Sequence, residues 1–166
     1  MVTYIQVQNV ITMSSKKVFG SIGILILLSL FFIRFSVISF EFKEGTYYTR
    51  SQQFDLIWIH SVEREEWIEM YRVQGNRLIL EKTQFKTFGA GVPSDAKEVA
   101  LENGYVVMKI EQPYDALNLT ISENVSSTIK IDEKEFKLYE YGKTYDTVQI
   151  TSEKINLWQY LKGEFL

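Results

Sequence analysis

Beyond residue 53, apolar and polar positions alternate with a period of two, in short runs separated by Gly, Asn and Asp. The runs are rich in β-branched and aromatic residues and recur about every 8–12 residues, which is typical of antiparallel sandwiches and small barrels. Residues 54–60 (FDLIWIH) are apolar on both faces and predict a central strand. Residues 66–73 and 77–85 flank the turn sequence Gln74-Gly75-Asn76 and predict a hairpin.

Further strands are predicted over residues 105–111, 116–121, 127–131, 135–139, 146–151 and 156–161. After Phe40 no segment keeps a helical period over twelve residues, although residues 94–103 (SDAKEVALEN) suggest a short helix. The predicted fold class is mainly β: an antiparallel β-sandwich or a small barrel-like domain, preceded by one N-terminal transmembrane helix.

The transmembrane helix is predicted from residues 18–33, which are uncharged and are followed by Arg34 and more apolar residues up to Phe40. Sixteen helical residues span about 24 Å, less than the ~30 Å hydrocarbon core of a bilayer. Extension to Phe40 would suffice if Arg34 snorkels toward the headgroups. Lys16 and Lys17 precede the run, so the positive-inside rule places the N-terminus in the cytoplasm.

A cleaved signal peptide is the alternative to this anchor. No small-x-small cleavage site follows the apolar run, and no cysteine is present for lipidation. We therefore expect a single-pass protein of the cell membrane, with Met13 as a second candidate start. Its parts would be a cytoplasmic N-terminus (1–17), a signal anchor in the lipid bilayer (18–40), a tether (41–53) and an extracytoplasmic β domain (54–166).

Charge is divided unequally along the chain. The first forty residues hold three basic and no acidic residues, whereas the rest hold 15 basic against 21 acidic residues, a net charge of −6. An acidic outer domain speaks against nucleic acid as a partner. The absence of cysteine excludes disulfides, thiolate catalysis and cysteine-ligated zinc.

The only histidine, His60, opens a candidate site. With a tight turn at Glu63-Arg64, His60 would face Trp67 and lie diagonal to Glu69 on one apolar face. Burial among aromatic side chains favours a pairing of His60 with Glu69. One interpretation is a structural pair that fixes the register of the hairpin, and the other is a ligand- or partner-binding site.

A glycine motif, FGAGVP at residues 88–93, predicts a bulge or a tight turn. Its amides could instead cradle an anion, which becomes relevant if this loop lies beside the turn at residues 60–63. The candidate binding residues are His60, Ser61, Glu63, Glu69, Tyr71, Gly89 and Gly91.

Motifs for catalysis are missing. There is no G-x-S-x-G and no H-E-x-x-H sequence, and Ser61, next to His60, would point to the opposite face of a strand. Glu63, Glu65 and Glu66 are more typical of a solvated acidic turn than of a calcium site. We therefore predict no catalytic residue, no metal and no cofactor. A small-molecule hydrolase that uses His60 and a carboxylate, or a purely structural envelope protein, are the alternatives.

Three motifs in order, HSVE at 60–63, E-x-Y at 69–71 and FGAGVP at 88–93, resemble an uncharacterised bacterial family with a domain of unknown function. The resemblance is strongest over residues 54–93. Its members are small, often membrane-anchored, and often encoded beside TRAP transporters of the TAXI type. The resemblance implies an accessory or binding module with TRAP transporter subunits as partners, and it implies nothing about catalysis.

Overall fold

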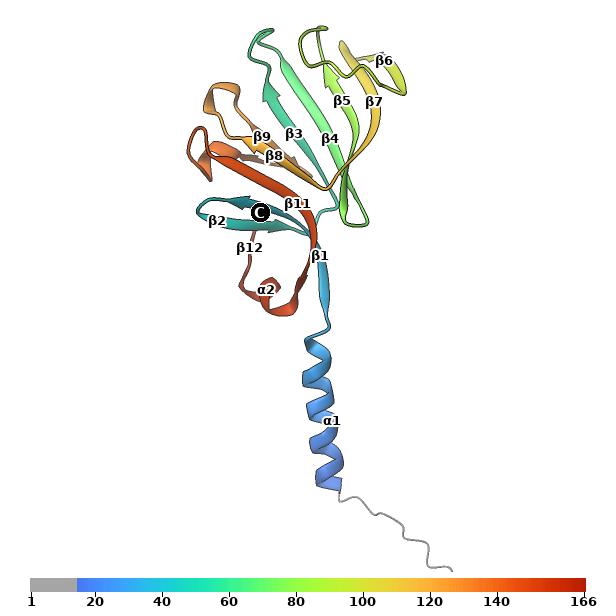
Figure 1. The fold of residues 1–166 in the computed structure, drawn as a ribbon, viewed down its shortest axis with the longest axis vertical. Helices are drawn as coiled ribbons and strands as arrows, with labels where there is room; N and C mark the ends of the chain where they lie inside the picture. The colour runs from blue at the N-terminus through green and yellow to red at the C-terminus, as the bar shows by residue number, and fades with distance from the viewer. Residues whose placement is uncertain (1–14) are drawn as a thin grey trace, which may run out of the picture. The chain divides into compact units, whose positions relative to one another are not determined.

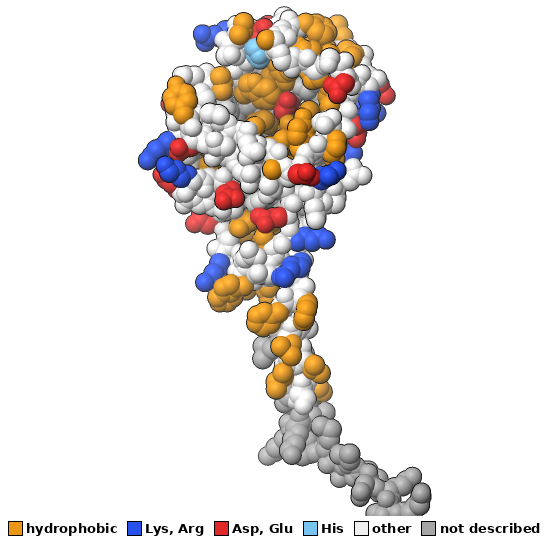
Figure 2. Space-filling view, viewed as in Figure 1, with side chains coloured by type: hydrophobic (Ala, Val, Ile, Leu, Met, Phe, Trp, Pro, Cys, Tyr) orange, Lys and Arg blue, Asp and Glu red, His pale blue; other side chains and the backbone are white. Residues whose placement is uncertain are grey.

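The computed structural model describes residues 15–166, and the chain divides into two compact units, Met1–Ile33 and Arg34–Leu166. The first unit contains helix α1 (Ser15–Leu30). Several of its apolar side chains are exposed, Phe19 and Leu25 among them, and Figure 2 shows apolar side chains along this helix. Within residues 15–166, no helix is both long enough and apolar enough to cross a membrane. The predicted cytoplasmic N-terminus, residues 1–17, lies mostly outside the described residues.

The second unit is built from two sheets that are largely antiparallel (Figure 1). Its strands are β1 (Arg34–Phe42), β2 (Gly45–Thr49), β3 (Gln53–Ile59), β4 (Glu66–Gln74), β5 (Arg77–Phe85), β6 (Glu98–Glu102), β7 (Tyr105–Tyr114), β8 (Ala116–Thr120), β9 (Thr128–Ile131), β10 (Lys134–Lys137), β11 (Thr147–Asn156) and β12 (Glu164–Phe165). Two 3-10 turns, η1 (Glu123–Val125) and η2 (Leu138–Glu140), and helix α2 (Leu157–Lys162) complete it.

The five-stranded sheet has the order β12-β2-β1-β11-β8, and the seven-stranded sheet has the order β10-β9-β3-β4-β5-β7-β6. The prediction of a mainly β fold is confirmed, and the strands form two separate sheets rather than one closed sheet. Strand β3 lies between β9 and β4, as its apolar sequence predicted. The hairpin turn is also confirmed, because only Gly75 and Asn76 separate β4 from β5, and Gly75 has the positive φ of 68° that such a turn favours.

The boundary between the apolar helix and the β domain was predicted wrongly. Helix α1 ends at Leu30, and residues 34–49 form β1 and β2 instead of the end of an anchor and the start of a tether. Strand β1 lies inside the five-stranded sheet, and its successive residues 37–40 are all buried. A strand buried on both faces is a continuous apolar run, so its sequence resembles that of a membrane helix.

Two further predictions were wrong. Residues 156–161 were expected to form a strand, but Asn156 starts α2 with a capping box: its side chain accepts a hydrogen bond from the Gln159 amide at 2.8 Å, and the Gln159 side chain accepts one from the Asn156 amide at 3.0 Å. This reciprocal capping favours the helix over the alternating pattern. Residues 94–103 contain no helix, because Val99 and Leu101 belong to the exposed edge strand β6.

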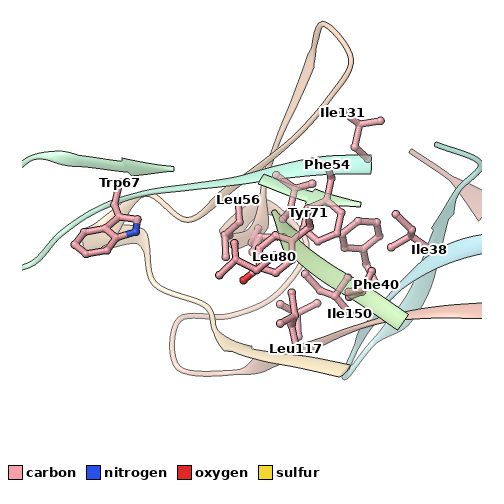
Figure 3. Close-up of a cluster of buried hydrophobic side chains, with 14 of the residues drawn as sticks. Ile38, Phe40, Phe54, Leu56, Trp67, Tyr71, Leu80, Leu117, Ile131 and Ile150 are labelled. Atoms are coloured by element: carbon pink, nitrogen blue, oxygen red, sulfur yellow. The ribbon is translucent and has the colours of Figure 1, made fainter. Parts of the chain in front are cut away.

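The hydrophobic core lies between the two sheets (Figure 3). Phe40 of the five-stranded sheet contacts Phe54 of the seven-stranded sheet, with ring centroids 6.0 Å apart, and Phe54 in turn stacks on Tyr71 at 5.1 Å. Fully buried Ile38 and Ile150 extend this contact on the side of the five-stranded sheet. Because the described unit contains no disulfide, burial of these side chains is the main stabilising contribution.

Candidate functional site

The turn between β3 and β4 is wider than predicted. His60 N donates to Glu65 O at 2.8 Å and Arg64 N donates to His60 O at 2.9 Å, so residues 61–64 form a four-residue loop. Two-residue hairpin turns need residues that tolerate positive φ, and neither Glu63 nor Arg64 is a glycine. In the wider loop only Arg64 takes a positive φ, of 58°. The predicted tight turn at Glu63-Arg64 is therefore wrong.

The wider loop shifts the register of the hairpin by two residues. Trp58 lies opposite Trp67, and Leu56 lies opposite Glu69. A shift of two keeps each side chain on its predicted face, so His60 and Glu69 share the inner face of the sheet. They are not neighbours, however, because the ring of Trp67 lies beside His60, with centroids 5.5 Å apart. The predicted pair of His60 and Glu69 is wrong.

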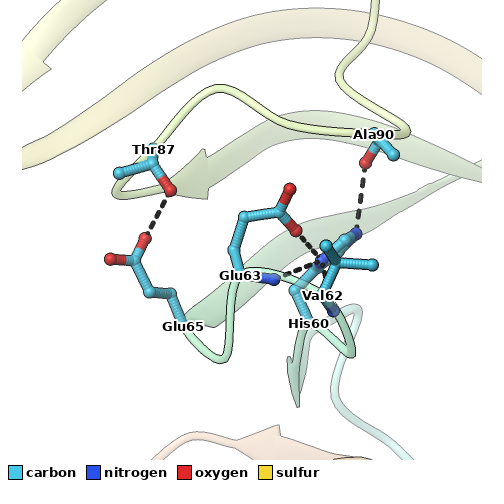
Figure 4. A network of polar contacts seen from close by, with 6 residues as sticks. All are labelled: His60, Val62, Glu63, Glu65, Thr87 and Ala90. Atoms are coloured by element: carbon cyan, nitrogen blue, oxygen red, sulfur yellow. Dashed lines mark hydrogen bonds and ion pairs between the residues drawn. The ribbon is translucent and has the colours of Figure 1, made fainter.

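The partners of His60 are a carboxylate and a backbone carbonyl (Figure 4). Nδ1 forms an ion pair with Glu63 Oε2, and Nε2 lies 3.1 Å from Ala90 O. Both partners are acceptors, so the ring satisfies both when each nitrogen carries a hydrogen. The amides of Val62 and Glu63 also approach Nδ1, but at 3.4 and 3.5 Å these contacts are at the outer limit of hydrogen bonding. Both ring nitrogens are thus engaged within the protein.

Glu63 is held by this contact. Its Oε2 atom is buried, and within residues 15–166 it has no polar partner other than the imidazole of His60. Its Oε1 atom lies against Gly89, where an added Cβ would be only 1.9 Å away. A side chain at position 89 is therefore incompatible with the observed position of Glu63. The anion that lies against the glycine motif is the protein's own carboxylate.

The glycine motif lies in the loop of residues 86–97 between β5 and β6, and Gly91 has a φ of 86°. This loop lies beside the β3–β4 turn. From the sequence, that position was the condition under which the glycine amides could take part in a site. A further bond joins the two segments, from Thr87 Oγ1 to Glu65 Oε2 at 2.7 Å. We call this set of contacts, made by His60, Glu63, Glu65, Thr87, Gly89 and Ala90, the turn–loop junction.

The turn–loop junction contains little empty space. The cavity inside it has a volume of about 10 Å³, close to that of a single water molecule, and Trp67 and Phe85 form part of its wall. A small molecule does not fit there. The junction instead presents two apolar side chains to solvent, Val62 from the turn and Phe88 from the loop, which are 71% and 65% exposed. Ser61 is also exposed.

Glu69 and Tyr71 lie further along β4, away from the turn–loop junction. The Tyr71 hydroxyl donates to Glu69 Oε2 at 2.5 Å. Burial raises the pKa of Glu69, although the hydrogen bond from Tyr71 opposes this. Burial, followed by the nearby charge of Glu69, raises the pKa of Tyr71. Each side chain satisfies the other in a poorly solvated place, so Glu69 has a structural partner that was not predicted, Tyr71 in place of His60.

The three acidic residues of the turn region have separate partners. Glu63 pairs with His60, Glu65 accepts from Thr87, and Glu66 accepts from the Tyr105 hydroxyl at 2.8 Å. In the described part of the chain, no group of three or more His, Asp or Glu residues is placed to hold a metal ion.

Ala90, Thr87 and the two exposed side chains Val62 and Phe88 were not predicted from the sequence as part of the site. Ala90 acts through its backbone carbonyl, which has no signature in the residue type. Phe88 and Val62 lie inside the FGAGVP and HSVE motifs, so the motifs themselves were the available signal for them.

The fold and the turn–loop junction define a two-sheet β protein in which two motif segments meet at one end of the seven-stranded sheet. A family model described as "Domain of unknown function (DUF1850)" matches residues 54–138, and the chain belongs to this family. The match begins in β3 and includes both segments of the turn–loop junction, so the resemblance to an uncharacterised family is confirmed. Searches of curated proteins and of solved structures found no match.

Proposed function

We propose that this chain is a membrane-attached, extracytoplasmic accessory module that binds a partner protein, a subunit of a TAXI-type TRAP solute transporter. Its recognition surface would be Val62 and Phe88 with the backbone around them, which we call the tip. The observation that carries the proposal is the turn–loop junction, because it holds two separate motif segments together while leaving their apolar residues exposed.

The position of the tip residues supports binding to a protein rather than to a small molecule. The ring of Phe88 packs edge-on against buried Phe85, with centroids 5.5 Å apart, so Phe88 is positioned before a partner arrives. Pre-positioned apolar and aromatic side chains lose little conformational entropy on binding and often dominate an interface. The cavity of about 10 Å³ in the turn–loop junction leaves no room there for a solute.

The apolar segment of the first unit supports the proposed attachment to a membrane. Residues 18–33 carry no charge and follow Lys16 and Lys17. Phe19, Leu25 and Phe32 are 74%, 65% and 83% exposed, and covering each such side chain with an apolar medium would stabilise it by about 1.5–3 kcal/mol. A bilayer would provide that cover. Helix α1 ends at Leu30, so the segment is shorter than the hydrocarbon core, and a bilayer accommodates such a segment by local thinning at a modest cost in free energy. The basic residues before the segment then favour a cytoplasmic N-terminus and an extracytoplasmic β unit.

The transporter as partner is supported by the family resemblance, which implies an association with solute uptake. Attachment to the same membrane would raise the local concentration of the module near its partner, so a small interface would be sufficient.

The test is recovery of partners from gently cross-linked native membranes with the full-length chain. A Val62→Ser, Phe88→Ser variant removes the tip, and a Val99→Ser, Leu101→Ser variant removes two exposed apolar side chains from strand β6 as a matched control. We expect wild type and the β6 variant to recover transporter subunits and the tip variant to lose them. Equal recovery by the tip variant would contradict the recognition surface. Recovery of no transporter subunit by wild type would contradict the proposed partner.

A further inference from the structure

We infer that helix α2 is a second membrane contact, in which Trp158 and Leu161 lie in the interfacial layer of the bilayer that holds residues 18–33. This inference rests on the membrane attachment proposed above and extends it to the folded β unit.

Helix α2 turns apolar side chains toward solvent. Trp158 and Leu161 are three residues apart, so they lie on the same face of the helix, and they are 66% and 67% exposed. The helix is held to the sheet by Tyr160, whose ring stacks on Phe35 of β1 with centroids 4.2 Å apart. The exposed pair is therefore fixed on the folded unit, where it forms a small apolar surface.

Strand pairing places α2 close to Arg34, the first residue after the apolar segment. Strand β1 starts at Arg34, directly after the apolar segment, and Arg34 lies opposite Asn156, the N-cap of α2. An opposed pair is separated by about 5.5 Å and two Cα steps add about 7.6 Å, so the Cα atoms of Arg34 and Trp158 are at most about 13 Å apart. Each polar layer of a bilayer is about 5–8 Å thick. Trp158 can therefore reach that layer when Arg34 lies at its edge.

The residue types fit the interface of a bilayer. Tryptophan has an apolar body with one polar group, and lysine and arginine extend their charged ends toward headgroups, so all three are frequent at this depth. Lys162 Nζ lies 4.6 Å from the centroid of the Trp158 ring, which joins both features on one helix. Figure 1 shows α2 beside the start of β1, with the β3–β4 turn at the other end of the same unit. A contact through α2 would thus point the tip away from the lipid.

The contact would depend on apolar insertion rather than on charge. The residues after Phe40 carry a net charge of −6, which is repelled by anionic lipid. We therefore expect the contact in vesicles of zwitterionic lipid and expect it to persist at high salt, where attraction between exposed charges is screened.

The test uses tryptophan fluorescence of the full-length chain in zwitterionic vesicles whose acyl chains carry bromine, a quencher of short range. The Trp158→Phe variant gives the background of Trp58 and Trp67, which are both more buried than Trp158. The first unit contains no tryptophan, so it does not contribute. A matched control, Phe88→Trp in the Trp158→Phe variant, places an exposed tryptophan at the tip instead.

We expect the emission of Trp158 to shift to shorter wavelength and to be quenched, and the tryptophan at position 88 to keep its emission. Flotation of the same vesicles measures attachment separately. A chain that floats while Trp158 is not quenched, or is quenched no more than a tryptophan at position 88, would overturn the role of α2 and leave the anchor standing. A chain that does not float would overturn both.

Discussion

The contact between Gly89 and Glu63 predicts that Gly89→Ala destabilises the wild-type protein but stabilises a Glu63→Ala variant. A Cβ at position 89 would lie 1.9 Å from Glu63 Oε1 and 2.4 Å from Glu63 Cδ. Non-bonded atoms do not approach each other so closely. Gly89 is not among the residues with positive φ, so alanine fits its backbone. In the Gly89→Ala variant the Glu63 carboxylate must therefore move, and we expect it to lose its contact with His60.

The magnitude follows from two opposing terms. Loss of the partner of a buried polar group lowers the free energy of unfolding by about 1–3 kcal/mol. The lower half of that range applies, because the side chains of His60 and Glu63 are 17% and 20% exposed. Replacement of glycine by alanine at a compatible backbone position raises the free energy of unfolding by about 0.4–1 kcal/mol through the unfolded chain. We expect a net destabilisation of about 1 kcal/mol for Gly89→Ala.

In a Glu63→Ala background the obstructing atoms are absent. Gly89→Ala should then stabilise the protein by about 0.4–1 kcal/mol, which gives a coupling free energy of about 1–2 kcal/mol between the two positions. The assay is urea unfolding of wild type, both single variants and the double variant in mild detergent, followed by tryptophan emission. An equal effect of Gly89→Ala in both backgrounds would refute the geometry of the turn–loop junction.

Three further changes probe the inner face and the core. Because burial raises the pKa of Glu69, this carboxyl holds its proton more tightly in the folded than in the unfolded chain. The contribution of Glu69 to stability is therefore present below its ordinary pKa of 4.5 and is lost as the pH rises through the raised pKa of the folded state. The Glu69→Gln variant should not show this loss of stability, which urea unfolding across that pH range would measure. Phe40→Ala, at a fully buried position between the sheets, should lower the free energy of unfolding by about 3–5 kcal/mol in the same assay. Thr83→Val removes the hydrogen-bond acceptor that lies 2.7 Å from the indole Nε1 of Trp67. This change should lower the free energy of unfolding by about 1–3 kcal/mol, which would be measured as a fall in Tm.

The strands of the seven-stranded sheet could largely be predicted from the sequence because their local signals agree. In residues 77–85 the β-branched and apolar positions, the preceding Gly75-Asn76 turn and the alternation all favour one strand, and β5 has these bounds. In residues 34–40 the signals conflict, because a strand buried on both faces has no alternation. There the structure depends on pairing with the neighbouring strands β2 and β11. The local pattern of apolar and polar residues carries no information about this pairing.

The sequence predicted which segments form the candidate site, but it did not predict which residues contact each other there. The motifs identified the turn around His60 and the loop around Gly89, and the structure brings these together. The partner of His60 depended on the turn type: Arg64 takes a positive φ, the turn widens by two residues, and Glu63 replaces Glu69 beside the imidazole. Turn conformation at a non-glycine residue depends on small differences in free energy, so the register predicted from the sequence was wrong.

The most direct test of the proposed recognition surface is photo-cross-linking from position 62. A photoreactive amino acid replaces exposed Val62 in the full-length chain, and a second chain carries it at exposed Val99 as a control. After irradiation in native membranes, we expect adducts with a transporter subunit from position 62 and none from position 99. Absence of an adduct at position 62, or equal adducts from both positions, would contradict recognition through the tip.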